Sequence, residues 1–197
     1  MKEILDDLGI DYKVGIDEAA FYGPKLDIQI KNVFGKEDTL ITIQIDMLLA
    51  EKFGMYYIDE NGEKALPYII HRTSMGCYER TLALLIEKYA GALPTWMSPE
   101  QVRILPITDR TLDYSKEIKA KLEAVGVRVE LDERSEKIGK KIRDAQLEKV
   151  PYMLVLGDKE AEAGQVAARS RKTGETEVMD ADAFVAKILM EIATRAR

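Results

Sequence analysis

Apolar and polar residues alternate in short runs along the first half of the chain, the pattern of β-strands that bury one face. Thr42, Gln44 and Asp46 fall on one face of such a strand. Apolar residues spaced by three and four then predict a helix over 76–89. This region is expected to be an antiparallel sheet with a helix laid on it. The predicted strands, two of which form a hairpin around Asn61 and Gly62, are 12–16, 25–30, 39–46, 56–58 and 68–70.

The second half alternates between strand and helix patterns, which predicts a layered α/β domain with a core of its own. Residues 152–156 are the most continuously apolar run and are predicted to be the buried central strand. Helices are predicted over 112–125 and 137–148, and Asp180 is predicted to cap a last amphipathic helix. The other predicted strands are 102–106, 127–131, 165–169 and 176–179.

A glycine and two prolines within 91–99 indicate a linker between the two patterns. The sequence is therefore divided into a first domain at 1–93, a linker at 94–99 and a second domain at 100–197.

Composition narrows the class of protein. The net charge of −6 arises in the first half of the chain. The second half has equal numbers of positive and negative side chains. Local patches of charge, and not the net charge, therefore decide whether the second half binds nucleic acid. One cysteine and one histidine exclude an internal disulfide and cannot complete a zinc site, which takes three or four protein ligands. No apolar run approaches the roughly 20 residues that span a bilayer, and the acidic N-terminus is unlike a secretory signal. A cytoplasmic protein is expected.

The segment 67–80 carries the most chemical information, because a predicted strand enters a predicted helix there. Gly76 lies at the junction, where the absence of a side chain lets a ligand approach the backbone. The helix N-terminus and the guanidinium of Arg80 both favour a phosphate group. The short pattern by itself is equally typical of a surface arginine paired with Glu79 or Glu87.

This segment resembles motif 3 of class II aminoacyl-tRNA synthetases. Further segments are similar to the threonyl-tRNA synthetase family in order and spacing, so that the resemblance covers nearly all of 10–197. These segments are 20–27, 70–72, 89–99, 134–143 and 150–160. The implied fold class is α/β: a partial class II antiparallel sheet with the motif 3 helix at 71–89, followed by a layered α/β anticodon-binding domain. The implied parent enzyme activates threonine with ATP and magnesium and charges threonine tRNA.

The resemblance also implies roles for residues of the first domain. Tyr22 would line the threonine pocket, and Lys25 would assist adenylate formation. His71 would be the third protein ligand of a zinc ion that binds the amino and hydroxyl groups of threonine. Such a site rejects valine, because a pocket built around a hydroxyl penalises its absence. The other implied contacts to ATP and substrate come from Thr42, Gln44, Gly76 and Arg80. Without the resemblance, a lone histidine is more often a core residue.

In the second domain, the resemblance implies that Ser135, Glu160 and Arg169 read the anticodon. RNA sequence is usually read in single-stranded loops, whose bases can be splayed out. Helical spacing places Lys137, Lys140, Lys141 and Asp144 on an outer face, with Arg134, Lys159, Arg171 and Lys172 expected nearby as phosphate contacts. The alternative is a solvated helix face, the usual role of a run of charges.

The sequence departs from the family at several points. Thr39 stands where a glutamine that touches ATP is expected, and Ser135 where an asparagine is typical. Motif 1, motif 2 and the other zinc ligands are absent from these 197 residues. We therefore expect the chain alone to bind tRNA, to lack zinc and to be catalytically incomplete, whereas the full-length enzyme is expected to be a homodimer. The alternatives are a free-standing, non-catalytic tRNA- or protein-binding module, or a prolyl, glycyl or histidyl synthetase.

Overall fold

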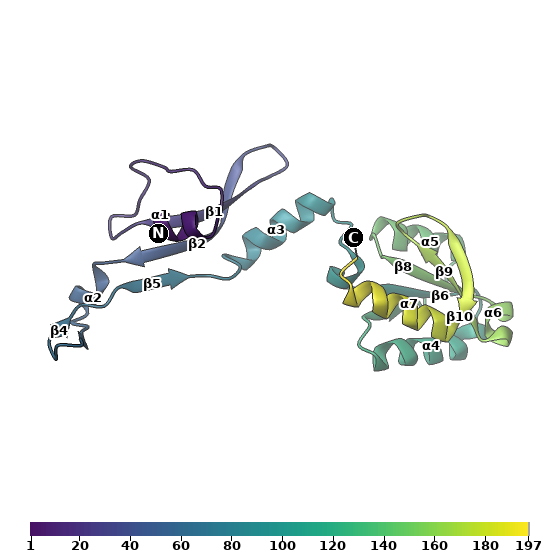
Figure 1. Ribbon diagram of the computed structural model, residues 1–197. Helices are drawn as coiled ribbons and strands as arrows, with labels where there is room; N and C mark the ends of the chain where they lie inside the picture. The colour runs from purple at the N-terminus through teal and green to yellow at the C-terminus, as the bar shows by residue number, and fades with distance from the viewer. Residues whose placement is uncertain (197) are drawn as a thin grey trace. The chain divides into compact units, whose positions relative to one another are not determined.

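The computed structural model describes residues 1–196 and divides into two compact units, Met1–Lys88 and Tyr89–Arg197 (Figure 1). None of the helices within 1–196 combines the length and apolar character needed to cross a membrane.

The first unit is built on a three-stranded antiparallel sheet in the order β1-β2-β5 (Figure 1). A separate small hairpin joins β3 and β4. The elements are α1 Lys2–Asp7, β1 Lys25–Lys31, β2 Glu37–Asp46, α2 Leu49–Lys52, β3 Tyr57–Ile58, β4 Lys64–Ala65, β5 Ile69–Arg72 and α3 Tyr78–Tyr89.

The register of this sheet gathers polar residues on one face. Gln44 of β2 lies opposite Lys25 of β1 and opposite His71 of β5. Thr42 lies opposite Asp27. Because directly opposed residues point to the same face and alternate residues of one strand do so as well, all five of these side chains share one face.

Two expectations about the strands of the first unit are wrong. Residues 12–16 form no strand, because no neighbouring strand pairs with them and Val14 and Ile16 are left exposed. The hairpin turn at Asn61 and Gly62 is present, but it joins β3 to β4. The segment predicted as its second strand instead leads into β5, which pairs with β2.

The apolar stripe of α3 is not buried, so the helix is not laid on the sheet as expected. Tyr78, Leu82 and Ile86 are 72%, 54% and 48% exposed. Buried apolar side chains are few in this unit: Leu5 and Ala50 are those among residues 1–88.

The start of α3 nevertheless approaches β2 very closely. Gly76 has φ +67°, and a Cβ added there would lie 2.0 Å from the carbonyl oxygen of Leu40. A glycine is therefore required at this junction both for its backbone conformation and for its lack of a side chain.

The second unit is a five-stranded mixed sheet in the order β10-β9-β8-β6-β7. Strand β6 is parallel to β7 and β8, whereas β9 is antiparallel to both β8 and β10. Its elements are η1 Thr95–Met97, β6 Val102–Pro106, η2 Asp109–Thr111, α4 Leu112–Ala124, β7 Val129–Leu131, α5 Ile138–Leu147, β8 Tyr152–Leu156, α6 Asp158–Ala163, β9 Gln165–Ser170, β10 Thr176–Asp180 and α7 Ala181–Ala193.

This sheet is covered on both faces. Helices α4 and α7 enclose the larger core, in which Leu122, Leu154 and Phe184 are buried, and α5 covers the other face over Leu105 and Met153. The predicted central position of β8 and the buried stripe of α7 are both confirmed. The short helix α6 was not predicted.

The residues that join the two patterns pack within the second unit. Thr95 Oγ1 donates to Glu191 Oε1 at 2.5 Å, and Gln101 Nε2 donates to the Thr95 carbonyl at 2.9 Å. Arg171 NH2 donates to the Leu93 carbonyl at 2.6 Å. The predicted domain limits stay a prediction, but residues 94–99 are an ordered part of this unit rather than a free tether.

We expect Phe184→Ala to destabilise the second unit by about 3–5 kcal/mol, since it removes a fully buried ring that contacts the ring of Tyr152 edge-on at 5.5 Å. Chemical denaturation followed by far-UV circular dichroism measures this. Met190→Ala on the same helix is the matched control, because Met190 is 70% exposed and should cost within about 0.5 kcal/mol. Equal effects would contradict the assigned core.

A second pair of variants tests the junction at α3. Gly9 and Gly76 have similar φ values of +63° and +67°, but nothing lies within 4 Å of a Cβ added at Gly9. Gly9→Ala should therefore lower the stability of the unit only by the backbone strain, about 1–3 kcal/mol. Gly76→Ala should cost clearly more, because it adds the collision with Leu40. Amide hydrogen exchange of β2 measures both, and equal protection in the two variants would refute the close approach.

Candidate functional site

The polar face of the first sheet is a connected set of hydrogen bonds. Tyr22 Oη donates to Gln44 Oε1 at 2.7 Å. The ring of Tyr22 lies 6.2 Å from that of His71, in an edge-to-face arrangement. The register that places Gln44 opposite His71 thus brings three predicted substrate contacts together.

Lys25 and Thr42 are held by a shared carboxylate. Lys25 Nζ donates to Asp27 Oδ2 at 2.6 Å, and Thr42 Oγ1 donates to Asp27 Oδ1 at 2.8 Å. Burial pushes the pKa of Asp27 up, but these two hydrogen bonds outweigh it and hold the pKa below its usual range. The hydrogen bond to Asp27 in turn raises the pKa of Lys25, so the ammonium stays charged.

Asp46 orients the histidine. It is fully buried, and its Oδ2 lies 3.1 Å from His71 Nε2. Its Oδ1 accepts the backbone N–H groups of Leu48 and Leu49, each at 2.9 Å. Burial works to raise the pKa of Asp46, but the bonds from Leu49, Leu48 and His71 hold it below its usual range. The carboxylate is therefore a fixed, charged support for the imidazole.

Five of the predicted residues line one open cavity of about 280 Å³. They come from β2, β5 and the start of α3, and they are Thr42, Gln44, His71, Gly76 and Arg80. Thr39, the position that departs from the family pattern, lines it as well. His71 and Arg80 therefore line the same cavity, as a nucleotide-and-metal pocket would require.

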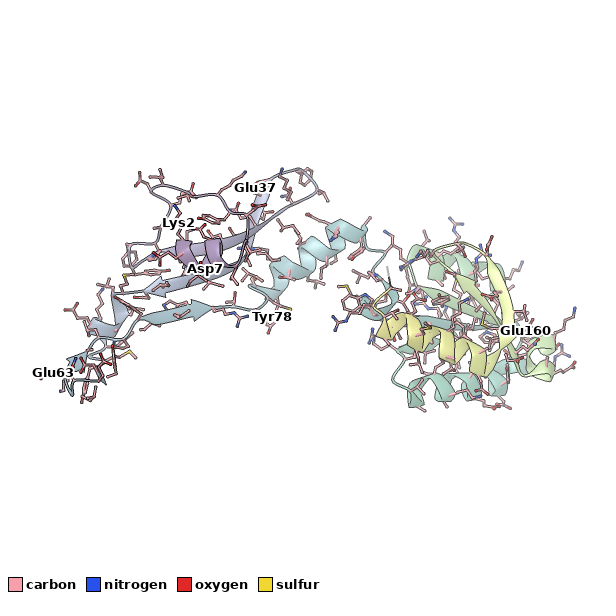
Figure 2. The ribbon with its side chains drawn as sticks, in the orientation of Figure 1. Lys2, Asp7, Glu37, Glu63, Tyr78 and Glu160 are labelled. Carbon is pink, nitrogen blue, oxygen red and sulfur yellow. The ribbon has the colours of Figure 1, made fainter. Side chains whose placement is uncertain are left out.

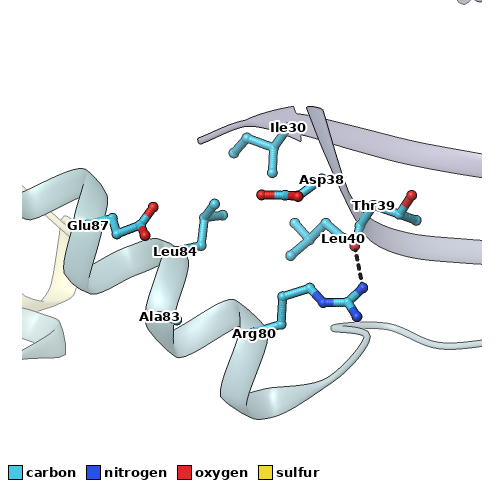
Figure 3. A pocket seen from close by; sticks show the side chains of 8 residues that line it. All are labelled: Ile30, Asp38, Thr39, Leu40, Arg80, Ala83, Leu84 and Glu87. Atoms are coloured by element: carbon cyan, nitrogen blue, oxygen red, sulfur yellow. Dashed lines mark hydrogen bonds between the residues drawn. The ribbon is translucent and has the colours of Figure 1, made fainter. Parts of the chain in front are cut away.

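Arg80 is anchored on β2 rather than paired with the nearby acids. Its NH1 donates to the carbonyl of Thr39 at 2.9 Å (Figure 3). Glu79 Oε2 instead accepts from Cys77 Sγ at 2.9 Å. A smaller cavity of about 90 Å³ adjoins Arg80, with Asp38 and Glu87 in its lining (Figure 3). The guanidinium keeps N–H donors for a further ligand, because this hydrogen bond uses only one of its five N–H groups.

Within residues 1–196, no group of three or more His, Cys, Asp and Glu side chains is placed to hold a metal ion. His71 supplies a single imidazole, whereas zinc takes three or four protein ligands.

The three predicted anticodon contacts lie on different elements of the second unit. Ser135 is exposed in the loop between β7 and α5, and Glu160 lies in the first turn of α6 (Figure 2). Arg169 is half-buried on β9, opposite Met153, and its Nε has no hydrogen-bond partner among the described residues. Glu160 Oε2 accepts the backbone N–H of Gly157 at 2.9 Å. No hydrogen bond or ion pair described within 1–196 joins the three residues to one another.

The expected outer-face position of Lys141 is wrong, and Arg171 is already hydrogen-bonded within the second unit. Lys141 is only 4% exposed and does not lie on the outer face of α5. Arg171 is committed to the backbone, where it donates to the carbonyls of Lys149 and Leu93, and burial lowers its pKa. Lys140 is exposed as expected, although it pairs with Glu136 at 2.5 Å.

Sequence reasoning missed the acids that hold the site. Asp27 and Asp46 each support predicted contact residues, and the alternation of polar residues along β1 and β2 was the signal that could have found them.

Comparisons with known proteins agree with this geometry. Residues 1–89 match the family model of the tRNA synthetase class II core domain (G, H, P, S and T), and residues 101–191 match that of the anticodon binding domain. The chain is 64% identical over 195 residues to a threonine–tRNA ligase of Clostridium perfringens (strain SM101 / Type A), covering 99% of the chain and 30% of that relative. It is 60% identical over 197 residues to that of Clostridium botulinum (strain Eklund 17B / Type B), covering 100% of the chain and 31% of the relative.

A solved structure is similar as well. The crystal structure of the RNA binding domain of threonyl-tRNA synthetase from Cryptosporidium parvum Iowa II matches with a TM-score of 0.85 and 36% identity, covering 96% of this chain and 48% of that one. Along nearly its whole length the chain is similar to threonine–tRNA ligases, with one match to a class II core domain and one to an anticodon binding domain, and it spans about 30% of the length of these curated relatives.

Proposed function

We propose that this chain contributes two parts of a threonine–tRNA ligase: one side of the site that activates threonine with ATP, and the module that binds the anticodon loop of threonine tRNA. The observation that carries the first part is the single cavity shared by His71 and Arg80. The alternative of a free-standing, non-catalytic module is not favoured, because a pure binder has no use for that cavity and the curated relatives are ligases.

In this proposal, Arg80 and the N-terminus of α3 bind the phosphates of ATP. A guanidinium fork matches phosphate oxygens, and the free N–H groups at a helix start favour negative charge. Gly76 lets the start of α3 lie against Leu40 of β2, because it carries no side chain. Thr42 and Gln44 stand between this region and His71 in the same cavity, where they would contact ATP and the substrate.

Lys25 and Tyr22 would act from the neighbouring positions on the face. The ammonium of Lys25 would stabilise negative charge during adenylate formation, and Asp27 keeps it in place. Tyr22 would line the threonine pocket through its contact with Gln44.

A class II core implies ATP with a divalent metal, and we propose magnesium as that ion. We also propose that His71 is one of the ligands of a zinc ion that selects threonine, with the other ligands supplied from outside these 197 residues. Asp46 would set the orientation of the ring, as carboxylates do for ligand histidines.

In the second unit, Ser135, Glu160 and Arg169 would contact anticodon bases, and exposed cations such as Lys140 would contact phosphates. We further propose a homodimer for the full-length enzyme and a cytoplasmic location.

We expect a threonine-dependent pyrophosphate exchange assay on this chain alone to remain at background. One histidine and one cysteine cannot complete the zinc site, and the cavity is open. The full-length relative from Clostridium perfringens, assayed in parallel, serves as the positive control. Exchange clearly above background in the isolated chain would contradict this division of the active site.

Two substitutions separate base contacts from phosphate contacts in the second unit. Arg169→Ala should weaken binding of the threonine tRNA by about 1–3 kcal/mol in a sequence-dependent way. Lys140→Ala should weaken binding of all RNAs evenly and reduce its salt dependence. Filter binding with threonine tRNA and an unrelated tRNA, across a salt series, measures both. If neither substitution changes binding, the surface around α5 is not the tRNA surface.

A further inference from the structure

A buried lysine lies beneath the loop that carries Ser135. Lys141 of α5 is 4% exposed, and its Nζ donates to the carbonyl of Asp132 at 2.9 Å and to that of Pro106 at 3.4 Å. Pro106 ends β6, and Asp132 directly follows β7, so the ammonium connects the carboxyl ends of two adjacent parallel strands. A buried charge is costly unless it is hydrogen-bonded, so these two carbonyls form a specific binding position for the Lys141 ammonium.

The same loop is tied to α5 a second time, through side chains. Asp132 accepts from Arg134 Nε at 2.9 Å and from Arg134 NH2 at 2.7 Å. Arg134 NH1 donates to Asp144 Oδ2 at 3.0 Å, one turn along α5 from Lys141. The hydrogen bonds from Arg134 hold the pKa of Asp132 below its usual range, so this network stays charged.

These ties frame a tight turn at Ser135. The backbone N–H of Glu136 donates to the carbonyl of Arg134 at 2.9 Å, which places Ser135 at the centre of a three-residue turn. The residues on each side of this turn are thus fixed, whereas Ser135 itself is exposed to solvent.

We propose that Lys141 is a positioning residue for anticodon reading: its buried ammonium, bound to the carbonyls of Pro106 and Asp132, holds the loop 132–137 so that Ser135 meets the RNA in one fixed position. This inference rests on the proposed binding of the anticodon loop by the second unit. Base reading requires a contact held to within about 0.5 Å, whereas phosphate attraction tolerates a mobile loop. Loss of the Lys141 ammonium therefore removes selectivity and leaves general RNA affinity largely intact.

Lys141→Met and Lys140→Met in the whole chain form a matched pair, since they make the same change of charge at adjacent positions of α5, one buried and one exposed. The measurement is the dissociation constant of an RNA stem-loop whose anticodon bases are replaced, divided by that of a stem-loop with the threonine anticodon. Lys141→Met should lower this ratio by about fivefold to tenfold, the effect of losing one base contact. Lys140→Met should weaken both RNAs and leave the ratio unchanged.

A measurement without RNA tests the loop itself. Amide exchange at Glu136, whose N–H closes the turn, should become much faster in Lys141→Met and change far less in Lys140→Met, which removes only the exposed ion pair with the Glu136 side chain. Faster exchange with an unchanged ratio overturns the positioning role while leaving anticodon binding intact. A wild-type chain that binds both stem-loops equally overturns the proposed binding function and the positioning role with it.

A third variant keeps the test decisive if Lys141→Met fails to fold. Asp144→Asn removes the negative charge from the contact with Arg134, at a partly exposed position, and leaves the hydrogen bonds of Lys141 in place. It should lower the ratio in the same direction by a smaller factor. An unchanged ratio in a folded Asp144→Asn chain, together with unchanged exchange at Glu136, contradicts the proposal.

Discussion

The pairing of β2 with β5, which sets Gln44 opposite His71, is the constraint on which the first unit depends. A shift of one residue would turn His71 to the other face of the sheet and separate it from Gln44, Tyr22 and Asp46. The close approach of Gly76 to Leu40 adds the second restraint, because it brings the start of α3 and Arg80 against the same strand. Together they assemble one cavity from segments that are distant in sequence.

Different interactions hold the side chains of the two units in place. The second unit has a closed core on both faces of its sheet, and even the segment that leads into it is hydrogen-bonded to it. In the first unit, few apolar side chains are buried, and the candidate site residues are held by polar pairs such as Lys25 with Asp27 and His71 with Asp46. Hydrogen bonds to buried or half-buried carboxylates thus fix the site, with little help from packing.

Sequence patterns predicted the elements whose signal is local. The apolar run of β8 and the stripe of α7 were recognisable because burial on one or both faces dictates them directly. The strand expected at 12–16 failed because alternation shows that a segment can pair, not that a partner is present. Lys141 was placed on the wrong side because helical spacing gives the direction of a side chain, but not that two strand ends lie within its reach.

The residues of the candidate site could be predicted because their pattern along β2 is local as well. Alternation put Thr42, Gln44 and Asp46 on one face, and resemblance supplied the roles of Tyr22 and His71. What neither could supply was the pairing between strands, and therefore the identity of Asp27 and Asp46 as the carboxylates that hold the others.

Cys77, the only cysteine of the chain, lines the cavity and allows the most direct measurement of this arrangement. A nitroxide attached to its exposed thiol broadens the NMR signals of nearby backbone amides. We expect strong broadening of the amides of Thr42 and Gln44 on β2 and of His71 on β5, and much weaker broadening in the hairpin β3–β4, at the other end of this unit (Figure 1). Sharp signals from both β2 and β5 would show that the start of α3 does not lie beside the polar face of the sheet, which contradicts the shared cavity.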